Sequence, residues 1–528
     1  TLVLTGLDNQ NFTGDTTISE GKVQIDSAEG LGTTGQLVLD GGSLQVVGNT
    51  EVTLDKKAVI TSNNGTVDNV SSNVTLSGVV SGAGQLVKSG AGKFSLTNEK
   101  NSFEGGVRIK DGTLEVSTDG SLGKANTQVL IDGATLAIAK DANLSRQIVL
   151  TEKGGAVSVA GTNTATLSGT LSLDAGVLSA DFTKSGTGTL NLTKDNTNFK
   201  GNTIIQEGTL GITGKDNLAQ GKLFLDGGNL RTNASLNFDK EIIINSTGGI
   251  DTSLDDLGNK TEVTVTSKIQ GNGGLVKTGI GTLTLSADNA YAGGTQVKGG
   301  TLVVNQDSNL GLQATDITLN GGTLQLGAAD AVSFKNGDAT SRLLKVGQEG
   351  GGLDVGAFDL TIETDIKGDG TLTQKGTKDG VLTLAGDNTA LKGGVTVESG
   401  TLKIDANKNL GATGAQLTLK DGTTLDTTAA NTKLVLEHSI TVGDGKATLK
   451  QDEDLSIRGL AGTDKANLNV NTGTKTLTLN GDSSTFAGNL LVQGNIEVKQ
   501  ILGTGNVEFN QGVANNAADS NLHITGNA

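Results

Sequence analysis

The sequence contains no cysteine, and this absence excludes three kinds of chemistry. Disulfides, thiolate zinc sites and cysteine nucleophiles all need a thiol that the chain does not have. A chain without thiols suits passage through an oxidising compartment, because no disulfide can trap it on the way. Methionine is absent too, and the chain opens on "TLVLTG", which already has the pattern of a strand. We therefore expect a fragment or a processed product of a longer protein.

Aromatic residues are scarce, and the chain is acidic. It has one tyrosine, no tryptophan and a net charge of -16. An acidic surface repels phosphate backbones, and few aromatic rings are available to stack on bases. We predict no nucleic-acid partner, and we expect the acidity to keep a long molecule soluble.

Proline is absent as well, and no long charge run or serine-rich stretch marks a linker. The 80 glycines are spread through apolar segments, which excludes a collagen helix. We find no signal peptide, no run of about 18 apolar residues for a membrane helix, and no aromatic-flanked strands of a membrane barrel. Because the composition is uniform along the chain, we predict one continuous architecture over residues 1–528. We predict no direct insertion of this chain into a membrane.

What the chain does contain is a repeat. An apolar residue, any residue and a glycine recur with a period of about 95 residues. The marks lie at Phe12–Gly14, Phe103–Gly105, Phe199–Gly201, Tyr291–Gly293, Leu391–Gly393 and Phe486–Gly488. Self-similarity at a fixed period is typical of solenoids, propellers and other repeat architectures.

Recurring sequence motifs, here called phrases, surround each of these apolar-x-glycine marks. In the clearest copies, "GNGGLVKTGIGTLTLS" fills Gly271–Ser286, "DNAYAGG" fills Asp288–Gly294 and "TQVKGGTLVV" fills Thr295–Val304, while "LVLDGGSLQV" fills Leu37–Val46. Apolar and polar residues alternate within them, which predicts short strands separated by Gly-rich turns. We expect the glycines to adopt positive φ or to approach a neighbouring coil. The Asn of "DN" fits a left-handed turn position or a ladder of stacked side chains.

Short, evenly spaced strands fit either sandwiches and propellers or a solenoid whose coils stack on one another. The apolar side chains are small and aliphatic, which favours the narrow interior of a β-solenoid. Roughly 18–22 coils of two or three strands would form a single elongated rod on the order of 100 Å long, at about 4.8 Å per coil. We expect little helix, with "DANLSRQIVL" at Asp141–Leu150 as the candidate for a short helical turn.

The phrases, taken in order, resemble the passenger-associated transport repeat of bacterial autotransporters. "GLVKTGIGTLTLSADNAYAGGTQVKGGTLVV" is the best copy, and the signature returns at Gly84–Val116, Lys184–Ile212, Gly370–Ile404 and Gly473–Val498. The resemblance implies an all-β, right-handed parallel β-helix like that of pertactin-type passengers. It also implies secretion through a C-terminal outer-membrane barrel that lies outside this sequence.

Candidates for catalysis are few. A serine triad needs a histidine base, and the chain has only His438 and His523, both in strand-like contexts. "GDSS" at Gly481–Ser484 resembles the "GDSG" of serine proteases, but we interpret it as part of the repeat. Its aspartate, Asp482, lies in the slot that other repeats fill with Asp195, Asp288 and Asp387. A glycosidase site needs two carboxylates in a cleft, and the sugar platforms that usually accompany them are missing.

Candidates for binding sites have simple structural explanations. We interpret "QDEDLS" at Gln451–Ser456 as a solvated acidic loop and "KGD" at Lys367–Asp369 as a turn. The sequon at Asn11–Thr13 matters only if the host glycosylates it. The Gly-rich segments lack a phosphate-loop motif and tandem calcium-binding nonapeptides. We therefore predict no catalytic, cofactor-binding or metal-ligating residue, and the ligand-binding residues stay unknown.

The sequence thus predicts a non-enzymatic, exported protein on a Gram-negative cell surface. Our first hypothesis is an adhesin for attachment, aggregation or biofilm formation, which binds a host-cell or matrix receptor, a surface glycan or another copy of itself along an extended face. The second is a structural stalk or surface layer that presents a distal domain. The third is a carbohydrate-active β-helix enzyme, and a threonine-array ice binder is a remote fourth.

Overall fold

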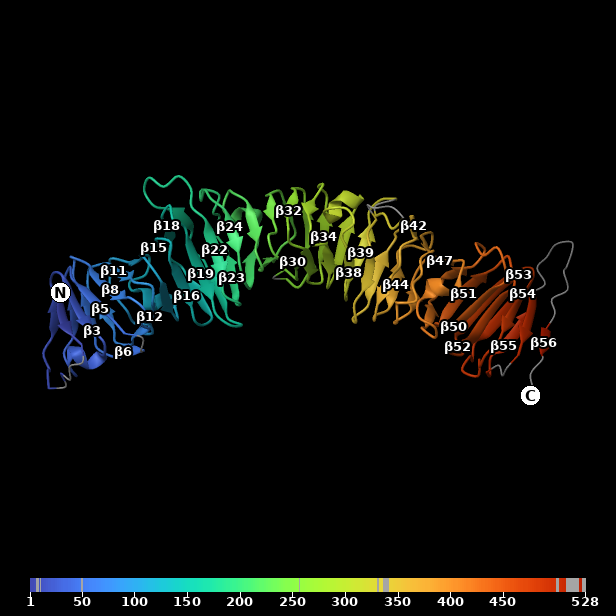
Figure 1. The fold of residues 1–528 in the computed structure, drawn as a ribbon, viewed down its shortest axis with the longest axis horizontal. Coiled ribbons are helices and arrows are strands. Elements are labelled where there is room, and N and C mark those ends of the chain that lie inside the picture. The colour runs from blue at the N-terminus through green and yellow to red at the C-terminus, as the bar shows by residue number, and fades with distance from the viewer. Residues whose placement is uncertain are drawn as a thin grey trace. The chain divides into compact units, whose positions relative to one another are not determined.

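The computed structural model describes residues 1–5, 9, 11–48, 51–255, 257–329, 332–335, 341–499, 503–509 and 522–524. These residues form an all-β structure of parallel strands, a β-solenoid of about 23 turns without an α-helix in the described ranges (Figure 1). The predicted fold class is confirmed. Two compact units divide the chain, Thr1–Asp251 and Thr252–Ala528. The hand of the coil, the single rod and the continuity of the architecture stay predictions.

In the first unit, three sheets begin near the N-terminus and a fourth begins in the second repeat. The first sheet orders β1 (Leu2–Leu4), β3 (Lys22–Ile25), β5 (Ser43–Val46), β8 (Gly65–Asn69), β11 (Leu86–Ser89), β13 (Val107–Ile109), β15 (Val129–Ile131), β18 (Ile148–Leu150) and β21 (Leu171–Leu173). The second orders β2 (Thr16–Ile18), β4 (Leu37–Leu39), β7 (Ala58–Ile60) and β10 (Val80–Ser81).

The third sheet of this unit orders β6 (Val52–Leu54), β9 (Val74–Leu76), β12 (Lys93–Leu96), β14 (Thr113–Val116), β16 (Thr135–Ile138), β19 (Gly155–Val159), β22 (Phe182–Ser185), β24 (Thr203–Ile205), β26 (Leu223–Leu225) and β29 (Ile242–Ile243). The fourth orders β17 (Ala142–Leu144), β20 (Thr164–Leu167), β23 (Thr189–Leu192), β25 (Thr209–Ile212) and β27 (Asn229–Thr232). The last strands before the second unit are β28 (Leu236–Phe238) and β30 (Gly248–Thr252).

The second unit contains two short strands and two longer series. The short ones are β32 (Ile269–Gly271) and β35 (Ala290–Tyr291). One series orders β33 (Leu275–Thr278), β36 (Thr295–Val297), β38 (Ile317–Leu319), β40 (Leu344–Val346) and β43 (Lys367–Gly368). The other, here the large sheet, begins with β31 (Glu262–Val265), β34 (Thr282–Leu285), β37 (Thr301–Val304), β39 (Thr323–Leu326), β41 (Gly351–Asp354), β42 (Asp359–Ile362), β44 (Leu372–Lys375), β45 (Val381–Leu384), β46 (Val395–Val397), β47 (Thr401–Ile404), β48 (Leu417–Leu419) and β49 (Thr424–Asp426).

Towards the C-terminus the strands of the large sheet lengthen. They are β50 (Leu434–Val442), β51 (Gly445–Lys450), β52 (Leu455–Gly462), β53 (Ala466–Leu479) and β54 (Asn489–Val498), followed by β55 (Asn506–Phe509) and β56 (Leu522–Ile524). β53 spans 14 residues, whereas the strands before β50 span two to five. These turns therefore replace several short strands and their corners with continuous ladders.

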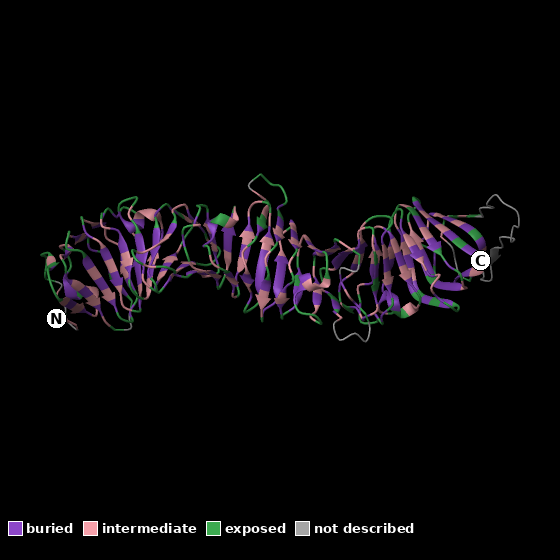
Figure 2. Ribbon diagram, turned by 90° about the horizontal axis from the view of Figure 1, so that it is seen from above, coloured by how far each residue is buried: buried purple, intermediate pink, exposed green. Residues whose placement is uncertain are grey.

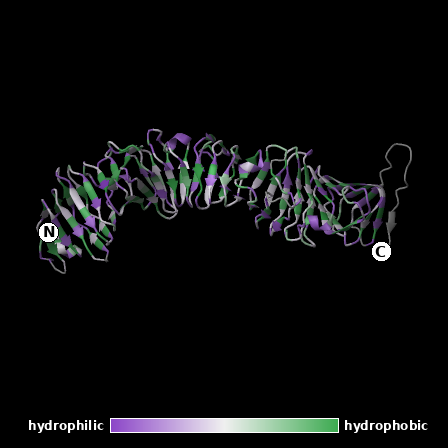
Figure 3. Ribbon diagram, turned by 45° about the horizontal axis from the view of Figure 1, so that its top comes forward, coloured by the Kyte–Doolittle hydropathy of each residue, from purple (hydrophilic) through white to green (hydrophobic). Residues whose placement is uncertain are grey.

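Strand alternation explains the core. In β16, Leu136 and Ile138 are buried while Thr135 and Ala137 between them are half-buried. A strand turns its side chains to opposite faces in succession, so the polar member of each pair faces solvent. The alternation of buried and more exposed residues, and of apolar and polar ones, recurs along both units (Figures 2 and 3). Parallel neighbours then stack like residues, since Val107 pairs with Val129 one turn later.

The predicted helical turn at Asp141–Leu150 is wrong. The segment forms β17 and β18, and it fits a strand because Leu144 and Leu150 are buried side chains of the solenoid core. The helical turns lie elsewhere, immediately after the "GTLxV" strands. They are 3-10 helices: η1 (Ala28–Leu31), η2 (Asp119–Leu122), η3 (Lys215–Asn217), η4 (Asp307–Leu310) and η5 (Asn407–Leu410).

The apolar residue of the repeat mark packs in the interior, and the glycine of the mark contacts the neighbouring turn. Five of the six apolar members are buried, and Phe12 is 46% exposed. A Cβ on Gly105 would lie 2.3 Å from the backbone N of Gln85, and one on Gly393 would lie 2.2 Å from the backbone C of Gly370. Only glycine fits at that spacing. The predicted close approach is confirmed at these marks.

Candidate functional site

Several recurring polar residues of the repeat are buried inside the solenoid. Lys88, Lys184 and Lys277 occupy the same slot and are fully buried. The Lys184 ammonium donates to the carbonyls of Ser185, Gly186 and Glu207, at 2.6–3.0 Å. Lys88 and Lys277 make equivalent sets of three bonds. Burial lowers the pKa of Lys184 to about 8, and that of Lys88 likewise to about 8.

The fifth repeat fills this slot with Gln374. Its amide donates one bond, to the carbonyl of Thr401 at 3.0 Å. Its carbonyl oxygen is buried and has no hydrogen-bond partner among the described residues. The slot therefore holds a buried donor in each of these repeats, but the lysines satisfy three carbonyls and the glutamine one.

The asparagine of the "DN" phrase clamps three successive turns. Asn196 accepts a bond from the Leu171 amide at 2.8 Å and donates to the Asn217 carbonyl at 2.7 Å. Asn388 makes the same pair of bonds in the fifth repeat. Neither has positive φ, so the left-handed option is wrong. The side chain links turns, and its role is to satisfy buried backbone groups.

An arginine or histidine side chain one turn later caps three of the 3-10 helices, η2, η4 and η5. The buried Arg146 guanidinium pairs with Asp119 of η2 at 2.9 Å and donates to the carbonyl of Gly123. Arg342 pairs with Asp307 of η4 in the same manner. His438 occupies this slot in the fifth repeat, where its ring contacts Asn407 Oδ1 at 3.0 Å. The bonds satisfy the free carbonyls that a helix end presents.

The two predicted histidine candidates differ in what the structure describes. The second ring nitrogen of His438 lies 3.1 Å from the Ala412 carbonyl, and burial lowers the pKa of this imidazole. The His523 side chain lies outside the described part of the chain. His438 thus acts as a cap whose hydrogen bonds go to the turn below it.

The "GDSS" segment belongs to the repeat. Ser483 is 1% exposed and fills the asparagine slot, where its hydroxyl accepts a bond from the Leu460 amide at 3.0 Å. Asp482 accepts the Ser484 amide at 2.8 Å, and hydrogen bonds from the Ser484 hydroxyl and amide lower the pKa of this carboxyl. Asp195 and Asp387 cap Thr197 and Thr389 in the same way. A buried, bonded Ser483 is not poised as a nucleophile.

The remaining predicted candidates take up strand and turn positions. Lys367–Gly368 form β43, and Asp369 follows it and pairs with Lys392 at 2.7 Å. The sequon residues Asn11–Thr13 are exposed. Within the described ranges no three acidic or histidine side chains gather as metal ligands, and no helix is both long and apolar enough to cross a membrane.

The outward-facing positions are where repeats differ. In the third repeat, strands β22, β24, β26 and β29 align Thr183, Ile204, Phe224 and Ile243 in register, here the third-repeat file. In the fifth repeat, β44, β46, β48 and β50 align Thr373, Thr396, Thr418 and Thr441, here the fifth-repeat file. All eight residues are half-buried. Inward neighbours in both sets of strands are buried and mostly aliphatic.

Within each unit, equivalent strands of successive repeats lie on different sheets. In the first unit, β11, β13, β15 and β18 of the second repeat belong to the first sheet, whereas β22, β24, β26 and β29 of the third repeat belong to the third sheet. In the second unit, β33, β36, β38 and β40 of the fourth repeat form one series, whereas β44, β46, β48 and β50 of the fifth repeat belong to the large sheet. The period of the sequence is therefore not a whole number of turns. The outward residues of successive repeats therefore lie on different sheets, and no single face of the described solenoid presents the same type of side chain from every repeat.

Threonine dominates the large sheet beyond the fifth-repeat file. Thr282, Thr301 and Thr323 stack on β34, β37 and β39. Gly352 on β41 joins this stack in register to Thr373. Parallel strands lie about 4.8 Å apart, so hydroxyl and methyl groups repeat at that spacing.

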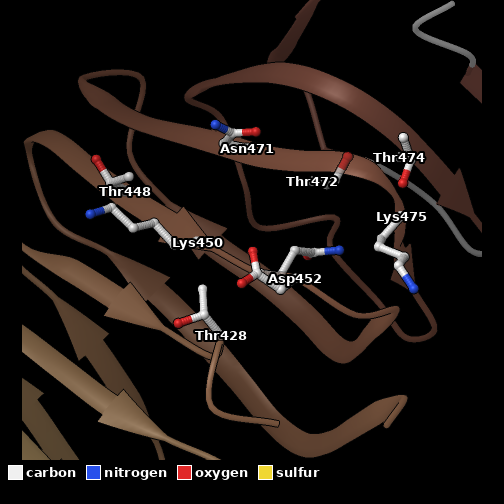
Figure 4. A pocket seen from close by; sticks show the side chains of 9 residues that line it. Thr428, Thr448, Lys450, Asp452, Asn471, Thr472, Thr474 and Lys475 are labelled. Carbon is white, nitrogen blue, oxygen red and sulfur yellow. The ribbon is translucent and has the colours of Figure 1, made fainter. Parts of the chain in front are cut away.

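A polar cavity of about 410 Å³ lies beside the long strands near the C-terminus (Figure 4). Its walls come from the end of β51, from the loop at Gln451 and Asp452, and from β53. It contains the first half of the acidic "QDEDLS" segment, which the sequence suggested as a solvated loop. Asp452 is exposed as expected, but Gln451 is 4% exposed.

Comparison with known proteins agrees with this geometry. The family model described as "Passenger-associated-transport-repeat" matches residues 1–25, 86–116, 182–212, 275–304, 372–404 and 470–494. The chain carries six passenger-associated transport repeats. The β-solenoid is consistent with a passenger domain that is built from such repeats. The four matched segments between residues 86 and 404 each contain the buried donor slot and a clamp asparagine, so these segments include residues that serve the interior.

Two curated relatives are similar in sequence to this chain over part of their length. The chain is 31% identical over 212 residues to "Adhesin BmaC autotransporter" of Brucella suis biovar 1 (strain 1330). It is 25% identical over 286 residues to "Uncharacterized lipoprotein YdeK" of Escherichia coli (strain K12). These alignments cover 38% and 46% of the chain, which spans 6% and 22% of the two relatives. No solved structure matches the chain.

Proposed function

We propose that this chain is the adhesive part of an autotransporter passenger, exported to the outer surface of a Gram-negative cell. One observation carries the proposal: the repeats keep their inward residues and vary the outward files. A purely catalytic protein would instead concentrate its variation and its titratable groups in one cleft. The relative named as an adhesin and the repeat family support a non-enzymatic surface role.

The mechanism is multivalent contact along the files. Each threonine of the fifth-repeat file offers one hydroxyl that donates and accepts, and a methyl group beside it. A single such contact is weak, but contacts repeated on adjacent strands bind together once the first has formed. Attachment to a host surface, aggregation and biofilm formation would all use this type of contact.

Self-association is one form of this function, and the charge of the chain sets its conditions. With a net charge of -16, two copies repel each other at low ionic strength. Reversible association in analytical ultracentrifugation that strengthens from low to physiological salt would support a self-recognising adhesin. A monomer at every concentration would overturn self-association through this chain and leave a heterologous receptor.

A cell-free adhesion assay tests the proposal. Beads coated with the chain should adhere to cultured host cells or to coated beads, and T396E/T418E should reduce that adhesion because it places two carboxylates in the fifth-repeat file. T53E/T75E, which places the same two carboxylates at paired threonines of β6 and β9 on another sheet, is the matched control. Unchanged adhesion in T396E/T418E, or an equal loss in both variants, with circular dichroism confirming the fold, would overturn contact through the threonine stack.

The stalk hypothesis has its own support. The buried lysines and asparagine clamps recur in several repeats and hold adjacent turns together, as a stiff spacer requires. Beads that never adhere, coated with a chain that remains folded, would favour a stalk that presents another domain.

A further inference from the structure

The cavity near the C-terminus contains polar groups that the protein itself does not use. Lys450 and Asp452 carry opposite charges, and neither makes an ion pair within the described part of the chain. The only lysine of the lining with a carboxylate partner is Lys475, which bonds Glu453 at 2.7 Å. The remaining cation and anion are free to meet a ligand.

Hydroxyl groups and a buried amide surround this charge pair. Thr428, Thr448 and Thr474 line the cavity. Gln451 is 4% exposed, and its carbonyl oxygen is buried with no hydrogen-bond donor among the described residues, while its amide nitrogen donates to the Glu453 carbonyl at 3.2 Å. This Gln451 oxygen has almost no accessible surface, so the groups that a ligand in the cavity can reach are Lys450, Asp452 and the threonine hydroxyls.

The register of the large sheet builds the site. Asp426, Lys450 and Asn471 are aligned across β49, β51 and β53. Thr424 and Thr448 are aligned one pleat away on the same face. The cavity is thus set into an outward face of the sheet, beside the ladder of polar side chains, and rests on backbone that is paired on both sides.

We propose that this cavity binds an acidic sugar unit, a uronate with a carboxylate and neighbouring hydroxyls. Lys450 would hold the carboxylate, since a charge-assisted bond is the strongest the cavity can offer. Asp452 accepts from two neighbouring hydroxyls, and the threonines donate or accept as the ring requires.

Other ligand classes satisfy fewer of these groups. Inorganic phosphate is mainly an acceptor of hydrogen bonds at neutral pH, so it offers Asp452 fewer donors than the several hydroxyls of a uronate do. A metal cation leaves Lys450 unmatched. No aromatic or large aliphatic side chain lines the cavity, so it does not suit an apolar ligand. A volume of about 410 Å³ lies in the range of small-molecule sites.

This inference deepens the proposed adhesion, because it names a receptor chemistry, but it can be tested without cells. Saturation-transfer NMR and calorimetry on the whole chain should detect trigalacturonate and should show much weaker binding of the neutral galactotriose. Lys450→Gln should weaken trigalacturonate binding about tenfold, the value of one charge-assisted bond. Asp452→Asn should weaken binding of both saccharides.

A lysine in the same ladder provides the control. Lys403 faces the same side as Lys450, and in register Asp426 lies between them. Lys403→Gln, outside the cavity, should leave trigalacturonate binding unchanged. Because Lys450 and Lys403 are outward residues, both variants should keep the circular dichroism spectrum of the wild type.

Several results would overturn the proposal. Equal binding of the two saccharides would exclude recognition of the carboxylate, and preferential binding of a zwitterion such as glycine would assign the charge pair to an amino acid. No binding of trigalacturonate at concentrations of about 10 mM, well above those of useful weak sites, would also overturn it. Bead adhesion that persists in that case would leave the proposed function intact and place its contact elsewhere.

Discussion

The third and fifth repeats have similar interiors and different exteriors. Asn196 and Asn388 make the same two bonds to the backbone of the turns above and below them. On the outside, the third-repeat file presents Ile204 and Phe224, where the fifth-repeat file presents Thr396 and its threonine neighbours. Inside a solenoid every backbone group needs a partner, whereas an outward position requires only a residue that suits a strand.

One interior position differs between the two repeats, with Lys184 in the third and Gln374 in the fifth. Lys184 satisfies three buried carbonyls, while Gln374 satisfies one and leaves its own oxygen without a partner. The two repeats therefore have similar cores, but at one position they differ in how many buried polar groups have a hydrogen-bond partner. Substitutions at matched positions can separate what the fold requires from what it tolerates.

The largest effect is expected at the asparagine clamp. Asn196→Ala and Asn388→Ala each leave a buried amide and a buried carbonyl without partners, which costs about 2–4 kcal/mol of local stability. Hydrogen exchange of the full chain, read by mass spectrometry on peptides of the adjoining strands, should show equal losses in both repeats. Lys200→Ala, at an exposed position of the third repeat, should change nothing. A loss in one repeat only would contradict the equivalence of their interiors.

Removing the buried donor should distinguish the repeats. Lys184→Met frees three buried carbonyls and should cost about 3 kcal/mol, whereas Gln374→Met frees one carbonyl, removes an unpaired oxygen and should cost about 1 kcal/mol or less. The same exchange measurement checks both variants. Equal costs would show that the lysine bonds add no net stability beyond that of a packed side chain.

The lysine slot also predicts a dependence on pH. Burial lowers the pKa of Lys184 to about 8 in the folded chain, and an exposed lysine titrates near 10.4 in the unfolded chain. Between these values the unfolded state holds more protons, so the free energy of unfolding rises with pH. Relative to Lys184→Met, the wild type should gain about 3 kcal/mol from pH 7 to pH 10.5.

Urea unfolding followed by circular dichroism at three pH values measures this difference, and Lys88 titrates in both proteins and cancels. Gln374→Met should track the wild type at every pH, because glutamine does not titrate. A difference that stays constant with pH would mean that the three carbonyls hold the ammonium charged throughout.

Sequence alone predicted the strands and the fold because inward and outward residues alternate within each phrase. It did not predict which outward residues are neighbours. Ile204 and Phe224 are aligned because one turn takes a particular number of residues, and that number varies between turns. The pairing of Lys450 with Asn471 in the cavity has the same origin.

The 3-10 helices and their caps were missed for a related reason. Asp119 and Arg146 are 27 residues apart, and only the stacking of turns brings the guanidinium over η2. An Asn-Leu-Gly phrase lies at the end of η4 and η5, yet three or four residues carry too little periodicity to indicate a helix. This position holds arginine in two repeats and histidine in a third. Its role as a cap is evident only from the carbonyls that the side chain contacts.

The smallest effect on stability is expected on the outside. I204T/F224T/I243T converts the third-repeat file to the chemistry of the fifth, and T396I/T418F/T441I does the reverse. Each should change the free energy of unfolding by less than about 1 kcal/mol, because threonine, isoleucine and phenylalanine all suit strands. Binding of the dye ANS, which reports exposed apolar surface, should fall in the first variant and rise in the second.

An inward neighbour supplies the contrast for this exchange. Ile205 follows Ile204 on β24 but is fully buried, so Ile205→Thr places a hydroxyl in the core and should cost about 2–4 kcal/mol. If the outward triple variant proved as destabilising as Ile205→Thr, the third-repeat file would have to be part of the core, and its apolar residues would not be available for adhesion. If it left stability and dye binding unchanged but reduced bead adhesion, the file would act through specific contacts with a partner rather than through its apolar character.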